Sequence, residues 1–383
     1  MPNFRWLALI VAIQANTLSA QIAVSANDGK ARPVDAPDAP RTVDSIAVLD
    51  IGKQPAKLLA TLPVPSTVVG PPATVAVSRD ARLAVVTAAQ QLNADGAPVP
   101  ADIVSVVDLS DPKHPRLVQT LHAALGAAGV AINPAGSLAL IANTNADSVS
   151  VLRIADGRLS PVGSVALDPR SRPVDIAFSA DGSSAYVVAQ GANSLVRLAI
   201  QGERVRRVGD DIALGAQPYS LAFDRRRNVA YVTNLGGRVP STVPGPKPGS
   251  IAIVDLRTGR MVGQVDTGVT PEYVGLSPSG RYLEATINNG TTAPQSSPAH
   301  HDRGLMIIYR ANGTSLDPVA QTDTGQWCQG AVWSKDETRI LLQCAGLKQI
   351  EAYRFNGRAL TRDGQATLQL DARPGAIATS FSR

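Results

Sequence analysis

The side chains with the most chemical capacity gather at His300-His301-Asp302-Arg303, which holds two of the four histidines in the 383-residue chain. An imidazole beside a carboxylate can act as a general base or bind a metal ion, so His301 is a candidate catalytic residue together with Glu272. Asp175 is the third candidate, because it is the one carboxylate in a set of aligned positions described below. A polar loop end without any chemistry is the commoner explanation of the histidine segment.

A second set of residues has the chemistry of ligand binding. Arginine holds carboxylates and phosphates, and aromatic side chains offer an apolar face with a polar edge. These residues stand near the starts of predicted strands, and we expect them to contact a ligand: Arg172, Tyr219, Tyr273, Trp327, Gln329 and Arg373. Packing between neighbouring elements explains the same residues equally well.

The chain contains none of the short motifs that mark nucleotide, metal or nucleophile sites. A phosphate-binding loop, a dinucleotide fingerprint, a G-x-S-x-G elbow, an H-E-x-x-H helix and a C-x-x-C pair are all absent from the sequence. We therefore predict no cofactor, and a divalent metal held by His, Asp and Glu is an alternative that no motif supports.

Cys328 and Cys344 are the only two cysteines. They stand at the outer ends of two predicted strands joined by a polar turn around Asp336, so a hairpin places them opposite each other. Paired strands bring cysteines close enough for a disulfide, whereas the spacing and nearby histidine of a metal or redox site are missing. We predict a structural disulfide.

The elements that position all these residues are short strands in a repeated pattern. Each unit has a strand with alanine or glycine at its centre, a turn of Ser, Asp and Gly, and three further strands. Six complete units begin 45 to 56 residues apart, which is the spacing of four-stranded propeller blades. The units begin at Pro72, Ala127, Pro173, Pro218, Pro271 and Trp327.

A seventh unit begins at Pro374 but contains only one strand. Residues 45–50 and 57–62 are unmatched strands near the other end of the chain, and residues 21–27 offer a third. We predict that both ends complete one blade, because a closed ring has no exposed strand edge. The expected fold is all-β: a seven-bladed β-propeller of four-stranded antiparallel blades over residues 44–383, after an N-terminal extension over residues 21–43.

Three segments resemble a known family. Residues 230–234 read Ala-Tyr-Val-Thr-Asn, residues 185–189 read Ala-Tyr-Val-Val-Ala, and residues 253–259 read Ile-Val-Asp-Leu-Arg-Thr-Gly. They resemble the YVTN-repeat propellers, which overlap the lactonase-type seven-bladed propellers, and the resemblance covers nearly the whole mature chain. It implies the fold but no single activity, because such propellers include lactonase-like enzymes, cycloisomerases, exported proteins of unknown role and a periplasmic protein that binds single-stranded DNA.

Alignment of the units gives two columns of residues on the innermost strands, which we expect to face the central channel. The first column holds only small residues: Ala76, Ala131, Ala177, Ala222, Gly275, Ala331 and Ala378. The second column, two residues earlier, is more polar: Thr74, Gly129, Asp175, Ser220, Tyr273, Gln329 and Ala376. We expect the first column to face a crowded axis and the second to line a water-filled mouth.

Three predicted loops between second and third strands are long: Gln90 to Asp102, Leu235 to Gly249 and Asn288 to Arg303. They lie on the same rim as the starts of the innermost strands. Loops longer than about 12 residues in a compact domain are usually functional or disordered. We expect this rim to carry a binding surface. Solvent-exposed loops without a function are an equally good explanation.

The first residues have the order of a secretory signal: Arg5, an apolar run over residues 6–13, and small residues up to Ala20. We predict that residues 1–20 are removed, with a cut after Ala26 as the alternative, and that the mature protein is periplasmic or secreted. The apolar run is shorter than the ~20 residues of a membrane span, and we expect no span elsewhere. Lys and Arg outnumber Asp and Glu only by 36 to 31, so the charge gives no reason to expect nucleic acid.

These observations favour an exported, non-catalytic propeller that binds a small molecule or a protein on the loop rim, because the aligned positions hold no complete catalytic set. One alternative, which the family resemblance implies, is a lactonase-like hydrolase in which Glu272 or Asp175 activates water and His301 assists. The other is single-stranded nucleic-acid binding, for which the aromatic residues near one mouth would stack on bases.

Overall fold

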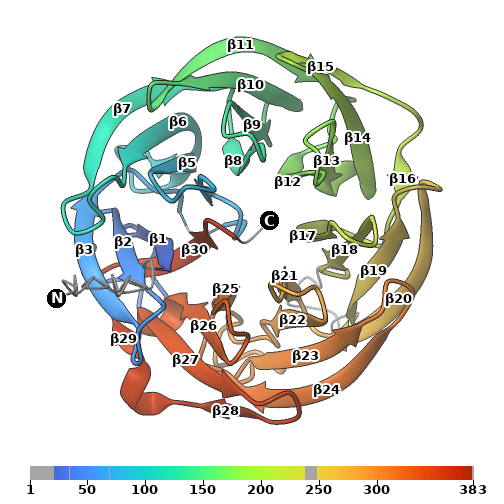
Figure 1. Cartoon of the computed structure of the whole chain (residues 1–383). Coiled ribbons are helices and arrows are strands. Elements are labelled where there is room, and N and C mark those ends of the chain that lie inside the picture. Colours follow the sequence, from blue (N-terminus) through green and yellow to red (C-terminus); the bar gives the residue numbers. More distant parts are fainter. Residues whose placement is uncertain (1–20, 34, 69, 238–247, 382–383) are drawn as a thin grey trace, which may run out of the picture.

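The computed structural model describes residues 21–33, 35–68, 70–237 and 248–381. These residues form seven sheets, arranged as blades around a central channel (Figure 1). The predicted all-β propeller is therefore confirmed. The helices among the described residues are single 3-10 turns: η1 (Gln190–Ala192), η2 (Ala345–Leu347) and η3 (Gly364–Ala366). The predicted signal over residues 1–20 and most of the predicted loop from Leu235 to Gly249 lie outside the described residues.

Six blades consist of consecutive antiparallel strands, named from the innermost outward. Blade 1 contains β4 (Val75–Val77), β5 (Leu83–Leu92), β6 (Pro98–Asp108) and β7 (Arg116–His122). Blade 2 contains β8 (Ala127–Ile132), β9 (Leu138–Asn143), β10 (Ser148–Ala155) and β11 (Arg158–Ala166). Blade 3 contains β12 (Pro173–Phe178), β13 (Ser184–Ala189), β14 (Ser194–Gln201) and β15 (Arg204–Arg207), with β16 (Ile212–Ala213) also paired to β14.

The remaining consecutive blades follow the same order. Blade 4 contains β17 (Pro218–Asp224), β18 (Val229–Asn234), β19 (Gly249–Asp255) and β20 (Arg260–Gly268). Blade 5 contains β21 (Pro271–Leu276), β22 (Tyr282–Ile287), β23 (Leu305–Ala311) and β24 (Leu316–Asp323). Blade 6 contains β25 (Cys328–Trp333), β26 (Arg339–Cys344), β27 (Gln349–Phe355) and β28 (Leu360–Arg362), with β29 (Leu368–Gln369) also paired to β27.

The seventh, closing blade joins both ends of the described chain. Its innermost strand is β30 (Arg373–Thr379), followed outward by β1 (Ile22–Asp28), β2 (Ser45–Asp50) and β3 (Lys57–Pro63). β1 pairs with β30 on one side and with β2 on the other, so the expected contribution of residues 21–27 is confirmed. The ring closes by hydrogen bonds, and β1 is an interior strand rather than part of an extension.

The antiparallel connections divide the propeller into two faces. The turn face carries the tight turns between first and second strands and between third and fourth strands. The loop face carries the connections between second and third strands and the crossovers to the next blade. The predicted loop from Gln90 to Asp102 is mostly a hairpin extension, since Gln91 pairs with Val99 and Leu92 with Pro98.

The core consists of layers between blades. Valine, isoleucine, leucine and alanine alternate along the inner strands, and both sides of each sheet are buried against a neighbouring blade. The buried hydrophobic side chains of the described residues form seven clusters, one at each blade interface. None of the helices in the described residues has the length and apolar content needed to cross a bilayer.

Neighbouring blades pack closely where they converge near the axis. A Cβ atom on Gly129 would lie 2.6 Å from the Val174 carbonyl oxygen and 2.7 Å from the Asp175 Cα of the next blade. The prediction that the column of small residues faces a crowded axis is wrong, because most of its members line two axial cavities of about 470 and 420 Å³: Ala76, Ala131, Ala222, Gly275, Ala331 and Ala378. Blade 6 departs from the alignment by one residue, since Val332 packs on the closing blade, whereas Ala331 packs in the cluster shared with blade 5.

The prediction that the second, polar column lines a water-filled mouth is wrong. Asp175 and Ser220 are fully buried, and Thr74 and Gln329 are 1% exposed. Both faces of a blade pack against neighbours, so a polar side chain near the axis points between blades and pairs with main-chain groups there. Asp175 Oδ2 accepts a hydrogen bond from the Leu221 N–H of blade 4 at 2.9 Å, and Gln329 Nε2 donates to the Gly375 carbonyl oxygen of the closing blade at 3.1 Å.

Candidate functional site

Glu272 belongs to a hydrogen-bonded chain that holds the long loop of blade 5. Its Oε1 accepts a hydrogen bond from Asn288 Nδ2 at 3.1 Å, and Asn288 Oδ1 accepts one from Thr291 Oγ1 at 2.9 Å. The same Thr291 hydroxyl accepts the main-chain N–H of Trp327 at 2.9 Å. The chain of contacts links blade 5 to blade 6, so two predicted site residues, Glu272 and Trp327, take part in fixing the loop.

The histidine pair occupies the other end of this loop, and the two residues differ. His300 is bonded through Nδ1 to the Ala293 carbonyl oxygen at 2.8 Å and through Nε2 to Asp302 at 3.3 Å. The hydrogen bond to Ala293 and the charges of Asp302 and Asp35 raise the pKa of His300. His301, the predicted catalytic partner, is exposed and forms no hydrogen bond or ion pair with any described residue.

Arg373 is a structural clamp. Its side chain is buried, with Nη1 donating to the Ala345 carbonyl oxygen at 2.7 Å and to that of Gly346 at 3.1 Å. Nε donates to the Ala31 carbonyl oxygen at 3.0 Å. The guanidinium thus fastens blade 6 and the segment after β1 to the closing blade, and it has little surface left for the anionic ligand that the sequence suggested.

The three remaining predicted ligand contacts are dispersed. Tyr273 is buried and its hydroxyl donates to the Ala331 carbonyl oxygen at 2.8 Å, which removes its ring from any stacking surface. Tyr219 is half-buried against the cluster between blades 3 and 4. Arg172 is exposed on the loop face, where its N–H donates to Asp147 Oδ1 at 2.8 Å.

A fourth long loop, which the sequence did not reveal as part of the rim, joins β1 to β2. Arg41 in this loop donates to the Gly96 carbonyl oxygen of the blade 1 hairpin at 3.3 Å. Asp35 Oδ2 accepts the Gln295 N–H of the blade 5 loop at 3.3 Å. The loop between β1 and β2 is therefore hydrogen-bonded to the long connections of blade 1 and blade 5 across the loop face.

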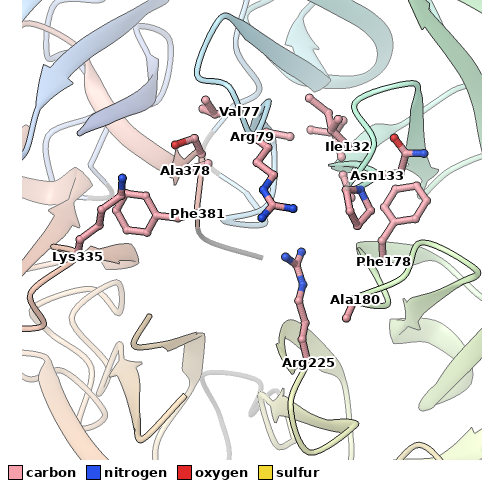
Figure 2. Close-up of a pocket in the computed structure, with 15 residues that line it drawn as sticks. Val77, Arg79, Ile132, Asn133, Phe178, Ala180, Arg225, Lys335, Ala378 and Phe381 are labelled. Atoms are coloured by element: carbon pink, nitrogen blue, oxygen red, sulfur yellow. The ribbon is translucent and has the colours of Figure 1, made fainter. Parts of the chain in front are cut away.

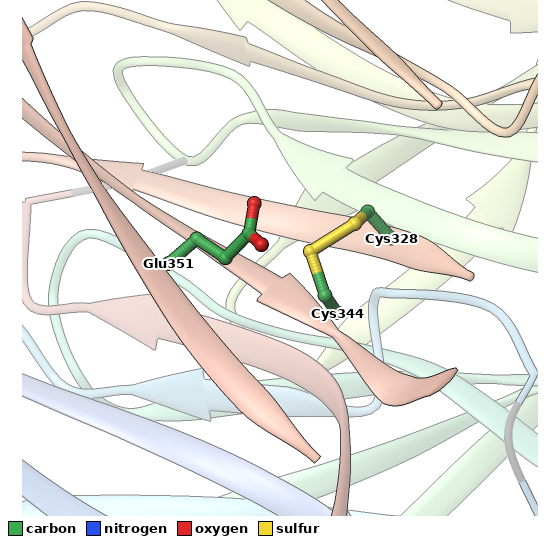
Figure 3. Close-up of side chains that lie close together, drawn as sticks. All are labelled: Cys328, Cys344 and Glu351. Carbon is green, nitrogen blue, oxygen red and sulfur yellow. A yellow bond between two sulfur atoms is a disulfide. The ribbon is translucent and has the colours of Figure 1, made fainter. Parts of the chain in front are cut away.

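The predicted disulfide is confirmed. Cys328 and Cys344 are partners in the register of β25 and β26, and their sulfur atoms are 2.03 Å apart. Glu351 lies beside them, as Figure 3 shows, and a ligand atom of each of the three residues falls within 4.8 Å of the others. Because both sulfurs are in the disulfide and Glu351 accepts the Tyr353 hydroxyl at 2.6 Å, this buried cluster is structural.

Two cavities lie on the turn face, at the mouth of the channel. They have volumes of about 470 and 420 Å³ and share Arg79, Arg225 and Phe381 in their walls. Figure 2 shows the side chains of Arg79 and Arg225 directed toward each other across the mouth, with Lys335 and Phe381 beside it. Lys335 Nζ lies 5.4 Å from the centre of the Phe381 ring.

These residues occupy equivalent positions in their blades. Each of blades 1 to 6 has a tight turn between its first and second strands, and the residue at the second position of that turn faces the mouth. Phe381 is the matching residue of the closing blade. We call these seven residues the turn ring. The first residue of the turn is recognised by its pairing with the second strand, as in the bond from the Ser78 N–H to the Leu83 carbonyl at 2.8 Å and from Ser334 to Arg339 at 2.9 Å. The turn ring consists of Arg79, Pro134, Ala180, Arg225, Pro278, Lys335 and Phe381, and each lines at least one of the two cavities. The sequence could have revealed this ring, because each of its residues stands one or two positions after the end of the innermost strand.

The fold and the site define a seven-bladed β-propeller with a cationic mouth on its turn face. No protein-family model and no curated protein sequence matches the chain, so the YVTN resemblance stays a prediction. The structure is similar to solved propellers. A putative 6-phosphogluconolactonase from Bacteroides fragilis has a TM-score of 0.69 and 14% identity, over 95% of this chain and 99% of that one.

Two further solved structures cover most of the chain. The periplasmic gluconolactonase of Pseudomonas aeruginosa has a TM-score of 0.68 and 14% identity, over 94% of this chain and 99% of that one. A hypothetical selenium-binding protein from Sulfolobus tokodaii has a TM-score of 0.66 and 11% identity, over 95% of this chain and 94% of that one. At such identities the likeness establishes the fold, and the differing names agree with the rule that function resides in the site.

Proposed function

We propose that the protein is an exported, non-catalytic binding module whose small-molecule ligand enters the axial cavities from the turn face. The observation that carries the proposal is the pair of cavities sharing Arg79, Arg225 and Phe381. Their volumes fall in the range of small-molecule sites, about 300–1,000 Å³. We favour the turn face over the loop rim, because Glu272, Trp327 and Arg373 are engaged in holding the loop face together.

Export is part of this proposal. A disulfide joins the only two cysteines, and disulfides persist in oxidising compartments such as the periplasm. One of the similar structures is named a periplasmic protein. We therefore place the mature protein in the periplasm or outside the cell, in agreement with the signal-like N-terminal sequence.

A thermal-shift screen of the chain from residue 21 to residue 383 against a small-molecule library tests the proposal. The screen is repeated on Ala180→Trp, because Ala180 lies in the turn ring and an indole there would fill part of the first cavity. The matched control is Ala166→Trp, since Ala166 is exposed at the end of the outer strand β11. A ligand that stabilises the parent and Ala166→Trp, but not Ala180→Trp, supports binding at the turn face. A ligand unaffected by Ala180→Trp contradicts it.

Lactone hydrolysis is the second candidate, supported by the names of two similar structures, a putative 6-phosphogluconolactonase and a gluconolactonase. Asp175 is fully buried in the bond to Leu221, which makes it a poor general base. Glu272 and His301 are the acid–base pair that this candidate would use on the loop face. Turnover of a lactone by the purified protein that is lost in Glu272→Gln and His301→Ala, but kept in Ala180→Trp, would favour the enzyme over the binding module.

A further inference from the structure

We infer that the turn-face mouth is an anion-binding site, and that its ligand carries at least two negatively charged oxygens held by Arg79 and Arg225. The inference rests on the proposed function, because it concerns the same cavities, and it adds the chemical class of the ligand. Carboxylates and phosphates share this chemistry, and both match the fork of N–H donors on a guanidinium group.

Arg79 and Arg225 lack counter-charges among the described residues. Among the described residues, neither Arg79 nor Arg225 forms an ion pair or donates a side-chain hydrogen bond. Other arginines of the turn face do: Arg227 pairs with Asp224 at 2.6 Å, and Arg116 pairs with Asp108 at 2.6 Å. The two guanidinium groups at the mouth therefore have no counter-charge in the described ranges of the chain, and their donors are available to a ligand in the channel.

A second feature is the placement of the acids in the same turns. Asp80 accepts the Ser78 hydroxyl at 2.5 Å, and Asp336 accepts the Ser334 hydroxyl at 2.5 Å. Serine and aspartate two residues apart close a local turn, which leaves the residue between them free to reach the channel. This middle residue is Arg79 in blade 1 and Lys335 in blade 6. The neighbouring aspartates, Asp80 and Asp336, bond to the turn serines rather than to these cations.

A third feature is the mutual position of the cations. Burial, and after it the charge of Arg79, lowers the pKa of the Arg225 guanidinium. Like charges that face each other repel, and an anion between them replaces the repulsion with two attractions. Low-dielectric walls strengthen this effect, because a concave site lined by one sign of charge focuses its field.

The walls define the kind of anion. No acidic residue stands in the turn ring, whose members other than Arg79, Arg225 and Lys335 are two prolines, one alanine and one phenylalanine. The one acid that lines either cavity, Asp224, is buried and paired with Arg227 at 2.6 Å. The ring of Phe381 borders both cavities and gives the ligand an apolar surface beside the cations. A compact di- or trianion fits this arrangement better than a neutral sugar.

The test is calorimetric titration of the mature protein with citrate, pyrophosphate and, as a neutral probe, glucose, at low and at high ionic strength. The variants are Arg79→Gln, Arg225→Gln and the double variant. Arg206→Gln is the matched control, because Arg206 is exposed on the outer strand β15 and undergoes the same change in charge. Circular dichroism and thermal unfolding show that each variant is folded.

We expect citrate or pyrophosphate to bind at low ionic strength, and high ionic strength to weaken the binding. Each single change at the mouth should weaken it about tenfold and the double change about a hundredfold, as for lost hydrogen bonds to charged groups. Tighter binding of one probe identifies the group as carboxylate or phosphate. Absence of binding by both anions, or an equal loss in Arg206→Gln, overturns the inference. A neutral library ligand that is blocked by Ala180→Trp but indifferent to the double variant overturns it as well, and leaves the proposed function standing.

Discussion

Replacing Glu284 with glutamine should stabilise the protein, and the gain should increase with pH. Glu284 is fully buried on β22, where Oε1 accepts the Thr286 hydroxyl at 2.5 Å. Its Oε2 has no hydrogen-bond partner among the described residues. Burial raises the pKa of Glu284 to about 8, and the hydrogen bond from Thr286 opposes this only in part. The folded protein therefore holds a neutral glutamic acid at pH 7.

The sign of the effect follows from where the proton is bound. The unfolded chain releases this proton near the ordinary pKa of 4.5, whereas the folded chain keeps it up to about 8. Between these values folding takes up a proton, so the free energy of unfolding falls as pH rises, by about 1.4 kcal/mol per pH unit. At pH 7 the accumulated loss is about 3 kcal/mol. Glutamine has the same shape, can accept the Thr286 hydroxyl and does not titrate, so it removes this loss.

Urea unfolding of the disulfide-intact protein, measured from pH 5 to pH 9, is the assay. The difference between Glu284→Gln and the parent should be small at pH 5 and reach about 3 kcal/mol at pH 7. A difference between two proteins cancels the contribution of other groups, including His300. Glu203→Gln is the matched control, because this exposed carboxylate lies on the surface and its removal should change stability by less than about 0.5 kcal/mol.

Two results would refute the reasoning. Parallel stability curves for Glu284→Gln and the parent would mean that Glu284 is ionised in the folded protein at neutral pH. A destabilised Glu284→Gln at every pH would mean that the interface between blades cannot accommodate the extra hydrogen atoms of the amide, and that packing outweighs the charge.

Three further predictions follow from the fold. Replacing both cysteines with serine should lower the free energy of unfolding by about 3 kcal/mol, the value for a loop of about 15 residues, and an unchanged urea midpoint would contradict the structural role of the disulfide. Asp175→Ala should cost about 1–3 kcal/mol by leaving the buried Leu221 N–H without an acceptor, with citrate binding unchanged in calorimetry; lost binding at intact stability would return Asp175 to the site. N-terminal sequencing of the exported protein should find Gln21 first, because a cut after Ala26 would remove most of β1, and Asn27 as the first residue would disprove this.

The sequence was sufficient for the blades and their closure. The period between units predicts seven blades, and the single strand after Pro374 requires strands from the other end of the chain. The disulfide followed from the same reasoning, because a hairpin folded about its polar turn pairs Cys328 with Cys344, and a bulge between Cys328 and Ala331 does not change this pairing. These features depend only on the spacing of the repeats and on the pairing of neighbouring strands, and both can be read from the sequence.

Side-chain direction near the axis was harder to obtain. Alternation along a strand separates two faces, but in a propeller blade both faces are covered by neighbours, so alternation does not show which residues meet the channel. Asp175 was expected in water for this reason, and it is found between blades 3 and 4. Arg373 illustrates a second difficulty, since its main-chain acceptors come from two other segments: Ala345 and Gly346 in blade 6, and Ala31 near the other end of the chain.

The net charge of the chain also does not predict the cluster of cations at the turn-face mouth. The chain has 36 basic and 31 acidic residues, a balance that favours no class of ligand. Charges more than about 8–10 Å apart are largely screened at physiological ionic strength, so a ligand responds to the groups nearest to it. Around the turn-face mouth the turn ring supplies Arg79, Arg225 and Lys335. The second cavity adds Arg226 and Asp224, and Asp224 is paired with Arg227. Seven-fold repetition places one side chain per blade around a single opening, so three substitutions in equivalent turns are enough to make a cationic site on a protein that is nearly neutral elsewhere.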